Sequence, residues 1–292
     1  MATKFRKIET TFLNEFKTGT LRPLLKYVQN DDTLNMELRG ESVIIYYRGG
    51  KILEIKDKTY DLVGLDKGYL SDKTKIFDEP VLNKIGDYFP KAKHHMDVYG
   101  AEKSKWELDI QQRIVQENNY SKNAISTDFF IVDTEYKNDK GRADIVALRW
   151  DSNAASRKKP ETTITFFEVK QGFKSISGDS GIVKHYYDFI SFKNDTEKVK
   201  DFISDMAAVF QQKRELGLFH KDMEKYKTLK QTDIKQDIEF VFLFANYDSD
   251  STKLKTELDK IDDCKIIHAN AMGYGLFEKN IIGKELFIKL FL

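Results

Sequence analysis

Two short apolar repeats at helical spacing open the chain. Apolar side chains recur every three or four positions over residues 5–16 and, beyond Gly19, over residues 21–28, as on the buried face of an amphipathic helix. From residue 34 to residue 66 the pattern changes to alternation and to β-branched and aromatic runs, with a Gly-Gly turn at 49–50. The pattern predicts two helices and then an antiparallel meander, which together form a small α+β unit.

A break in this periodicity separates the first unit from the rest of the chain. Residues 71–95 contain Pro80 and Pro90 among mixed charges and show no clear apolar period, which favours an irregular connection. We therefore expect two domains, an N-terminal α+β domain over residues 1–95 and a second domain over residues 96–292.

The second half of the chain predicts an α/β domain. The stretch 101–118 has no Gly or Pro and carries apolar residues at helical spacing. Runs rich in β-formers then alternate with helical patterns, and Asp179 or Ser180 is expected to cap the helix that follows them. We expect strands over residues 129–133, 143–150, 162–169, 238–247 and 265–268, and helices over residues 182–192, 199–216 and 254–261.

Composition and charge narrow the class of protein. Of the 292 residues, 40% are hydrophobic and 13% are aromatic, which is enough for a packed core. The formal net charge of +1 gives no overall field toward nucleic acid or membranes, so a polyanionic partner must be bound by local patches. The chain has one cysteine, no signal-like apolar segment near its start and no apolar run of membrane length. We therefore expect a soluble, cytoplasmic protein without a membrane partner.

Two acidic residues stand at matching ends of two neighbouring predicted strands. Asp144 begins the strand 143–150, whereas Glu168, followed two positions later by Lys170, ends the strand 162–169. If the strands form a hairpin, the start of the first lies beside the end of the second, and the two carboxylates converge next to a lysine. Carboxylates, water and phosphate oxygens are the ligands that Mg²⁺ prefers. The pattern therefore predicts a Mg²⁺ site that activates water for phosphoryl chemistry.

A further acid can come from the helix before these strands. Glu107 and Gln111 are four positions apart, so they share one face of the predicted helix 101–118. Glu102 and Glu117 compete with Glu107 for this role. The spacing alone does not choose among the three acids.

The arrangement resembles the PD-(D/E)XK nuclease superfamily, which has the restriction-endonuclease-like fold. The resemblance rests on an acid on a helix, an acid at a strand start and the triplet Glu168-Val169-Lys170 at a strand end, and it extends over about residues 100–250. It implies a restriction-endonuclease-like mixed sheet and a metal-dependent phosphodiester hydrolase, a nuclease acting on DNA with Mg²⁺ or Mn²⁺. By position, it implies Lys170 as the catalytic lysine and, as catalytic acids or metal ligands, Asp144, Glu168, the backbone carbonyl of Val169, and Glu107.

Other positions follow from the resemblance or from their charge. Gln171 is a residue that several branches of the superfamily also have after the lysine, whereas Ala143 stands where many members have proline. Arg142 lies in the turn before the strand acid, and Lys184 and His185 begin the helix after the site. A solvated loop and a surface helix face account equally well for these three residues. The candidates for substrate contact are Gln171, Arg142, Lys184 and His185.

Several alternatives stay open. The acid-x-lysine pattern also occurs at Glu54-Ile55-Lys56, although its partner strand offers Glu41 and then no acid, and Glu168 with Lys170 could form an exposed edge pair. The functional alternatives are a catalytically inactive nuclease-fold module for nucleic-acid binding or assembly, and an interaction protein with an incidental acidic cluster. The sequence leaves open DNA versus RNA, single versus double strands, sequence specificity and a homodimer.

Overall fold

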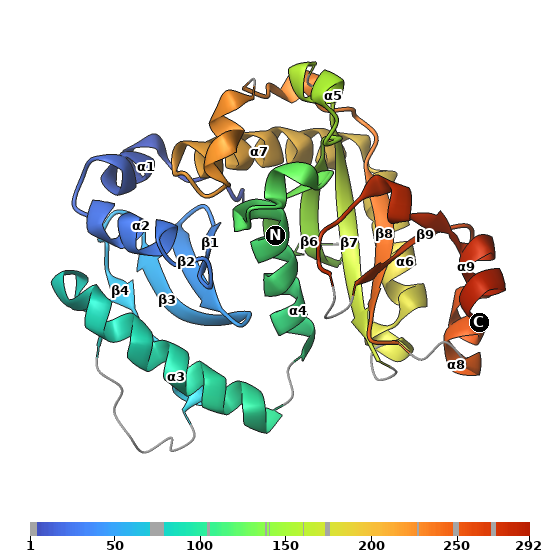
Figure 1. Cartoon of the computed structure of the whole chain (residues 1–292), viewed down its shortest axis with the longest axis horizontal. Coiled ribbons are helices and arrows are strands. Elements are labelled where there is room, and N and C mark those ends of the chain that lie inside the picture. Colours follow the sequence, from blue (N-terminus) through green and yellow to red (C-terminus); the bar gives the residue numbers. More distant parts are fainter. Residues whose placement is uncertain are drawn as a thin grey trace.

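The architecture is α/β with two sheets (Figure 1). Within the part of the chain that is described, four strands form an antiparallel sheet and six form a mixed sheet flanked by helices. The predicted α/β class and the mixed sheet are therefore confirmed. The computed structural model describes residues 5–70, 79–103, 106–137, 139, 141–159, 161–172, 176–226, 228–247, 251–269 and 273–292.

The N-terminal unit has the elements that its apolar pattern predicts. Its strands pair antiparallel in chain order, with Gly49 at φ +72° in the turn between the second and the third, a conformation that glycine adopts without strain. Phe12 and Phe16 of the first helix are fully buried in the core beneath this sheet. The elements are α1 (Thr10–Lys17), α2 (Arg22–Gln29), β1 (Asn35–Leu38), β2 (Ser42–Tyr47), β3 (Gly50–Lys56) and β4 (Leu62–Val63).

The connection to the second sheet is helical. The helix α3 (Ile85–Lys103) continues through Pro90, so the irregular segment predicted over residues 71–95 is wrong for residues 85–95, while residues 71–78 lie outside the described residues. Contacts with β3 hold this helix, because packing outweighs the helix-breaking tendency of proline. The division of the chain at residue 95 stays a prediction. The side chains of α3 buried in the core include Phe89, Ala92 and Met96.

The mixed sheet has the strand order β10-β9-β8-β7-β6-β5. Strand β8 is parallel to both β7 and β9, and the other neighbouring pairs are antiparallel. Its strands are β5 (Phe129–Lys137), β6 (Arg142–Arg149), β7 (Thr163–Gln171), β8 (Glu239–Ala245), β9 (Lys265–Ala269) and β10 (Ile282–Gly283). The helices in this part of the chain are α4 (Trp106–Val115), α5 (Ala154–Lys158), α6 (Ile182–Lys193), α7 (Thr196–Glu215), α8 (Thr252–Leu258) and α9 (Lys284–Phe291).

Three details differ from the predicted elements. The single helix expected over 101–118 is divided between the end of α3, α4 and a π-helical turn over Gln116–Tyr120. The N-cap of α6 is Gly181 without a side-chain hydrogen bond, so capping by Asp179 or Ser180 is wrong. The short elements α5, α9 and β10 were not predicted, and α9 is held by the burial of Phe287.

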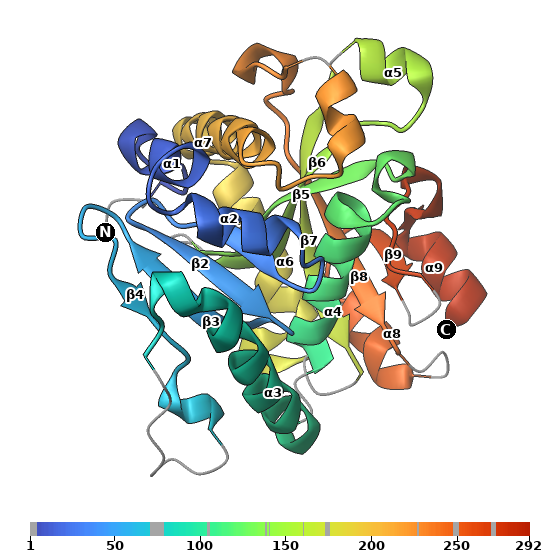
Figure 2. The same cartoon turned by 60° about the vertical axis from the view of Figure 1, so that its left-hand side comes forward.

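Helices cover both faces of the mixed sheet. Helix α4 packs with Phe167 and Val169 in one apolar cluster, whereas α6 and α7 pack with Phe166 in another. Both views show α4 between the N-terminal sheet and the mixed sheet (Figures 1 and 2). On the N-terminal side, the Gly49 N–H donates to Gln112 Oε1 of α4 at 2.6 Å. Helix α4 therefore contacts both the N-terminal sheet and the mixed sheet.

A buried ion pair joins the N-terminal unit to α7. Glu37 of β1 and Lys213 of α7 are both fully buried, with Lys213 Nζ 2.7 Å from Glu37 Oε2. Burial raises the pKa of the Glu37 carboxyl even though Lys213 acts in the opposite direction. Asn35 Nδ2 donates to the other carboxylate oxygen at 3.0 Å. The pair is therefore hydrogen-bonded as well as charge-compensated, which buried charges require.

Two arginines make a second connection, to the edge strand β5. Arg39 pairs with Asp133 Oδ1, and Arg6 Nε lies 3.1 Å from Asp133 Oδ2. The backbone N–H groups of Arg6 and Lys7 donate to the Asp205 carboxylate of α7 at 2.7 and 3.1 Å. One continuous hydrophobic cluster contains residues of both sheets, so the two units share a core.

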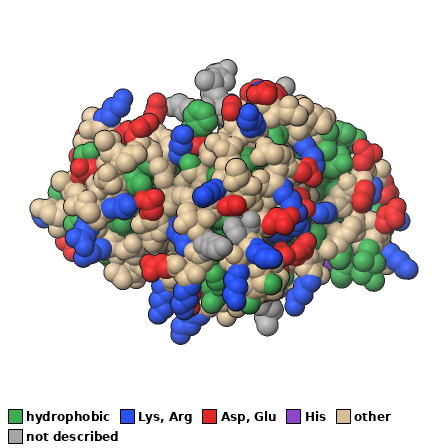
Figure 3. Space-filling model, turned by 90° about the horizontal axis from the view of Figure 1, so that it is seen from above, with side chains coloured by type: hydrophobic (Ala, Val, Ile, Leu, Met, Phe, Trp, Pro, Cys, Tyr) green, Lys and Arg blue, Asp and Glu red, His purple; other side chains and the backbone are tan. Residues whose placement is uncertain are grey.

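The exposed face carries mixed charge. Lys and Arg side chains are interspersed with Asp and Glu over the face seen from above (Figure 3), as the net charge of +1 suggests. Among the described residues, every helix is too short or too polar to span a lipid bilayer.

The buried pair between Glu37 and Lys213 gives a stability prediction. Lys213→Met keeps the volume of the side chain but removes the hydrogen-bonded cation of the buried Glu37 and leaves it only Arg39, whose Nη1 lies 3.8 Å from Glu37 Oε2. We therefore expect the free energy of unfolding in urea to fall by about 3 kcal/mol. Lys17→Met is the matched control, because Lys17 joins α1 to Glu215 of α7 through an exposed pair; its loss should stay below about 1 kcal/mol. Equal losses in the two variants would contradict the prediction.

The single cysteine gives a second prediction. Burial raises the pKa of the Cys264 thiol to about 12, and the thiolate is the form that reacts with disulfide reagents. We expect the native protein to react with Ellman's reagent at pH 8 at least about 100-fold more slowly than the urea-unfolded protein. Rapid stoichiometric labelling of the folded chain would show that Cys264 is accessible and ionised.

Candidate active site

The register of β6 and β7 places the two strand acids side by side. The strands are antiparallel with Ile145 opposite Phe167, so the next pair outward is Asp144 and Glu168. The N–H of Val169 donates to Asp144 Oδ2 at 2.8 Å. Directly opposite residues point to the same face of a sheet, and both carboxylates are fully buried. The two acids therefore converge as the hairpin geometry predicts.

Lys170 completes a buried group with these acids. Its Nζ donates to Glu168 Oε1 at 2.6 Å and to the backbone carbonyl of Ser180 at 3.0 Å. The side chain of Lys170 is 2% exposed, so the interpretation of Glu168 and Lys170 as an exposed edge pair is wrong. Lysine is almost never fully buried unless it is paired. Here Lys170 is paired with Glu168, and the Ser180 carbonyl, from the segment before α6, accepts a second hydrogen bond from it.

Glu107 lies near this group from the opposite direction. It stands in the first turn of α4. Burial raises the pKa of its carboxyl, while Lys170 and Arg142 act to lower it. By contrast, Glu102 is exposed near the end of α3, and Glu117 accepts a hydrogen bond from Asn123 at 3.3 Å. Glu107 is therefore the competing acid that lies within electrostatic reach of Lys170.

The four candidates for substrate contact fall into two pairs. Arg142 Nη2 lies 3.3 Å from Asp144 Oδ1, and His185 Nδ1 lies 3.1 Å from Glu168 Oε1 without hydrogen-bonding geometry. These two side chains therefore belong to the group. Lys184 is exposed on α6 and pairs with Asp188 at 2.5 Å, and Gln171 is half-buried at the end of β7.

The local field favours an added positive charge. Burial raises the pKa of Asp144 well above its ordinary value, and the neighbouring Glu168 raises it further. Burial also raises the pKa of Glu168 to about 7, against the effect of Lys170. Burial and the nearby cations Lys170 and Arg142 lower the pKa of His185 to about 3, so this imidazole is neutral. For Asp144, Glu168 and His185 alike, removal of the side chain from water is the largest cause of the pKa shift.

Two buried carboxylate oxygens lack hydrogen-bond partners. Asp144 Oδ1 and Glu168 Oε2 are buried and accept no hydrogen bond from the described residues, a situation that normally costs free energy. Among the described residues, no three His, Cys, Asp or Glu side chains form a metal-holding group by themselves. The donors present fit a cation bound by two carboxylates, with a backbone carbonyl and water supplying the rest, which is the kind of site that Mg²⁺ accepts.

Sequence reasoning missed Glu135 and Ser180. Glu135 lies in the part of β5 beyond the predicted strand 129–133, and its Oε2 lies 3.3 Å from Arg142 Nη1. The alternation of Asp133, Glu135 and Lys137 is the sequence signal that the predicted strand continues beyond residue 133. Ser180 takes part only through its backbone carbonyl, so its side chain gave no signal.

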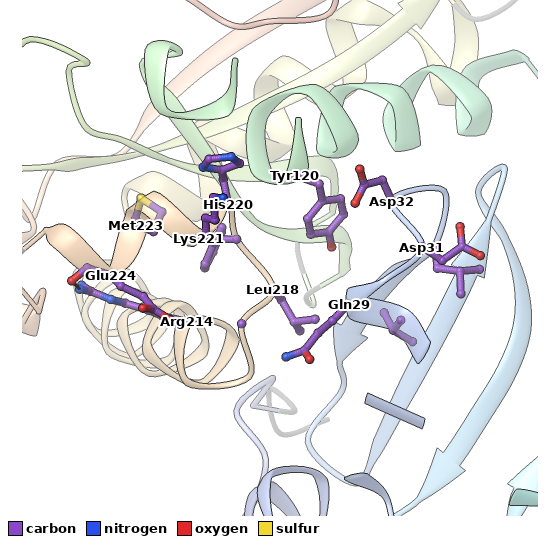
Figure 4. A pocket seen from close by; sticks show the side chains of 14 residues that line it. Gln29, Asp31, Asp32, Tyr120, Arg214, Leu218, His220, Lys221, Met223 and Glu224 are labelled. Atoms are coloured by element: carbon purple, nitrogen blue, oxygen red, sulfur yellow. Dashed lines mark hydrogen bonds between the residues drawn. The ribbon is translucent and has the colours of Figure 1, made fainter. Parts of the chain in front are cut away.

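A separate pocket of about 350 Å³ lies between α2 and the end of α7. In the close view Arg214, His220 and Lys221 approach from one side, and Gln29 and Asp31 from the other (Figure 4). Tyr120 also lines it. None of the predicted site residues lines this pocket, so it is distinct from the group around Asp144.

Comparisons with known proteins add nothing to this geometry. No protein family model matches the chain. No curated protein matches it, and no solved structure matches it.

The unsatisfied carboxylates predict a stability effect. Asp144→Asn keeps an acceptor for the Val169 N–H but removes one of two adjacent buried charges. In EDTA we expect its free energy of unfolding to exceed that of the natural chain by about 1 kcal/mol. Addition of about 10 mM Mg²⁺ should stabilise the natural chain by about 1 kcal/mol and leave D144N unchanged.

The control for this measurement is Glu54→Gln. Glu54 stands between Lys51 and Lys56 in the acid-x-lysine segment Glu54-Ile55-Lys56 of β3, outside the candidate site. E54Q should keep the full response to Mg²⁺. An equal response of D144N and the natural chain in thermal or urea unfolding would show that Asp144 holds no cation.

Proposed function

We propose that the chain is a metal-dependent nuclease of the PD-(D/E)XK superfamily, with a restriction-endonuclease-like fold. The observation that carries the proposal is the convergence of Asp144, Glu168 and Lys170 at one end of the β6–β7 hairpin. The chain order α4-β5-β6-α5-β7-α6-α7-β8, with β8 added parallel to β7, supports the same conclusion. The chemistry is hydrolysis of phosphodiester bonds, with DNA as the expected substrate.

The residues that would hold the metal are those with unsatisfied or charged oxygens. Asp144 and Glu168 offer buried carboxylate oxygens, the carbonyl of Val169 is a further donor, and Glu107 is the additional acid on α4. A bound Mg²⁺ or Mn²⁺ would supply Lewis-acid activation of water and stabilise charge on phosphate oxygens. Hard oxygen ligands of this kind select such ions over softer metals.

Lys170 places a positive charge at the centre of the site. Its ammonium group is fixed by Glu168 and by the Ser180 carbonyl, so it needs no reorganisation to stabilise developing negative charge. His185 contributes a neutral ring beside Glu168, because its pKa is lowered to about 3. A neutral imidazole does not compete with a divalent cation for the carboxylates by charge.

Substrate binding must rely on local contacts. The interspersed charge of the face in Figure 3 gives no continuous basic surface there. Arg142 is 43% exposed at its side chain and adjoins Asp144, so it can reach a phosphate next to the site. Lys184 is exposed on the following helix, and Gln171 ends β7. These contacts bind phosphate without reading bases.

The proposal predicts metal-dependent cleavage that depends on the triplet in β7. Plasmid and oligonucleotide substrates incubated with Mg²⁺ or Mn²⁺ should be cut, with no product in EDTA. Asp144→Ala and Lys170→Ala should each lower the rate at least about 1000-fold while keeping the circular dichroism spectrum of the natural chain.

Lys56→Ala is the matched control for Lys170→Ala. Lys56 is the lysine of the acid-x-lysine segment Glu54-Ile55-Lys56 and pairs with Glu54 on β3, so its loss should leave cleavage unchanged. Metal-dependent cutting that survives in D144A or K170A would reject the assignment. Nucleic-acid binding in EDTA, together with no product even in Mg²⁺ or Mn²⁺, would instead support the inactive nuclease-fold module.

A further inference from the structure

Glu135 has an unusual backbone for a strand residue. Its φ of +53° lies in the left-handed region, inside β5. A residue other than glycine pays about 1 kcal/mol or more for this conformation, which persists only where the surroundings fix it. The conformation accompanies the shifted register of β5 against β6 around residues 131–133.

Two arginines from the N-terminal unit hold this segment. Arg6 Nη2 donates to the carbonyl of Glu135 at 3.1 Å, and Arg39 Nη2 donates to the carbonyl of Thr134 at 2.9 Å. Both arginines also pair with Asp133. The side chain of Arg39 is 8% exposed, so the contacts are largely shielded from water and from screening by salt. The backbone at Glu135 is therefore held from outside its own sheet.

The Glu135 side chain shares Arg142 with the candidate site. One end of the Arg142 guanidinium lies 3.3 Å from Glu135 Oε2, and the other lies 3.3 Å from Asp144 Oδ1. Within the described parts of the chain, Glu135 Oε1 is buried without a hydrogen-bond partner, and so is the same Asp144 oxygen. Arg142 is therefore close to Asp144 without a well-directed bond. The guanidinium therefore lies between two carboxylates.

We propose that Glu135 is a positioning residue that shares the Arg142 guanidinium with Asp144 and so weakens the hold of Arg142 on Asp144 Oδ1, the oxygen that a divalent cation would take. The inference rests on the proposed function, because it assumes that Asp144 binds the cation. Arg142 and the cation compete for one oxygen, since both carry positive charge and approach the same side of Asp144. Glu135 biases this competition by giving the guanidinium a second carboxylate. Arg142 then faces solvent, where a substrate phosphate can bind it.

The test is Mn²⁺ binding by the full chain without substrate. The electron paramagnetic resonance signal of free Mn²⁺ measures the dissociation constant directly. We expect Glu135→Gln to weaken binding about tenfold when Arg142 is present, and less than about threefold in the Arg142→Gln background, because the two residues act as a coupled pair. Arg142→Gln alone should tighten binding about threefold, since the competing cation is gone.

Glu278→Gln is the matched control. Glu278 pairs with Arg149 at the other end of β6, at 2.8 Å, so E278Q removes a comparable Glu–Arg pair and should leave Mn²⁺ affinity unchanged. Circular dichroism checks that each variant is folded. If E135Q does not fold, R142Q still tests the competition between Arg142 and the cation. The Arg142 side chain is partly exposed, so this variant should fold, and the proposal requires it to bind Mn²⁺ more tightly.

The outcomes separate this inference from the proposed function. Equal weakening by E135Q with and without Arg142, or weaker binding in R142Q, would overturn the positioning role while leaving the cation site in place. Mn²⁺ affinity that is the same in D144A and in the natural chain would overturn the cation site itself, and with it the positioning role.

Discussion

The antiparallel register of β6 and β7 is the constraint on which the candidate site depends. Because the pair adjoining Ile145 and Phe167 must be Asp144 and Glu168, a change of register by one residue would turn one acid to the opposite face. The hydrogen bond from the Val169 N–H to Asp144 Oδ2 fixes this arrangement locally. The apolar contacts of Phe167 and Val169 with α4 fix it from the other face.

Burial of Asp144, Glu168 and Lys170 costs free energy, and the packing of the surrounding structure offsets this cost. Two buried carboxylates repel each other, and Lys170 and Arg142 compensate for only part of that charge. Sites with such local conflict are commonly functional, because selection retains an unfavourable arrangement only when the activity needs it. The extensive aromatic and aliphatic packing on both faces of the sheet supplies the stability against which this cost is set.

Much of the fold followed from local patterns, because alternation and helical spacing report which face of an element is buried. The hairpin that joins Asp144 to Glu168 was predictable for this reason, since strand ends and the intervening loop are both visible in the sequence. Helix α3 was not predictable, because its contacts with β3 outweigh the helix-breaking effect of Pro90. The backbone conformation of Glu135 was not predictable either, because it is set partly by Arg39, which is 95 positions away from its hydrogen-bond partner Thr134.

The link between the first residues and α7 has a consequence for synthesis on the ribosome. Arg6 donates its backbone N–H to Asp205, 199 positions later in the chain, and it also contacts Glu135. Contacts of such long sequence separation form late, because the intervening polypeptide must first be made and then closed into a loop. The contact of Arg6 with α7 therefore forms only after more than two thirds of the chain has been translated.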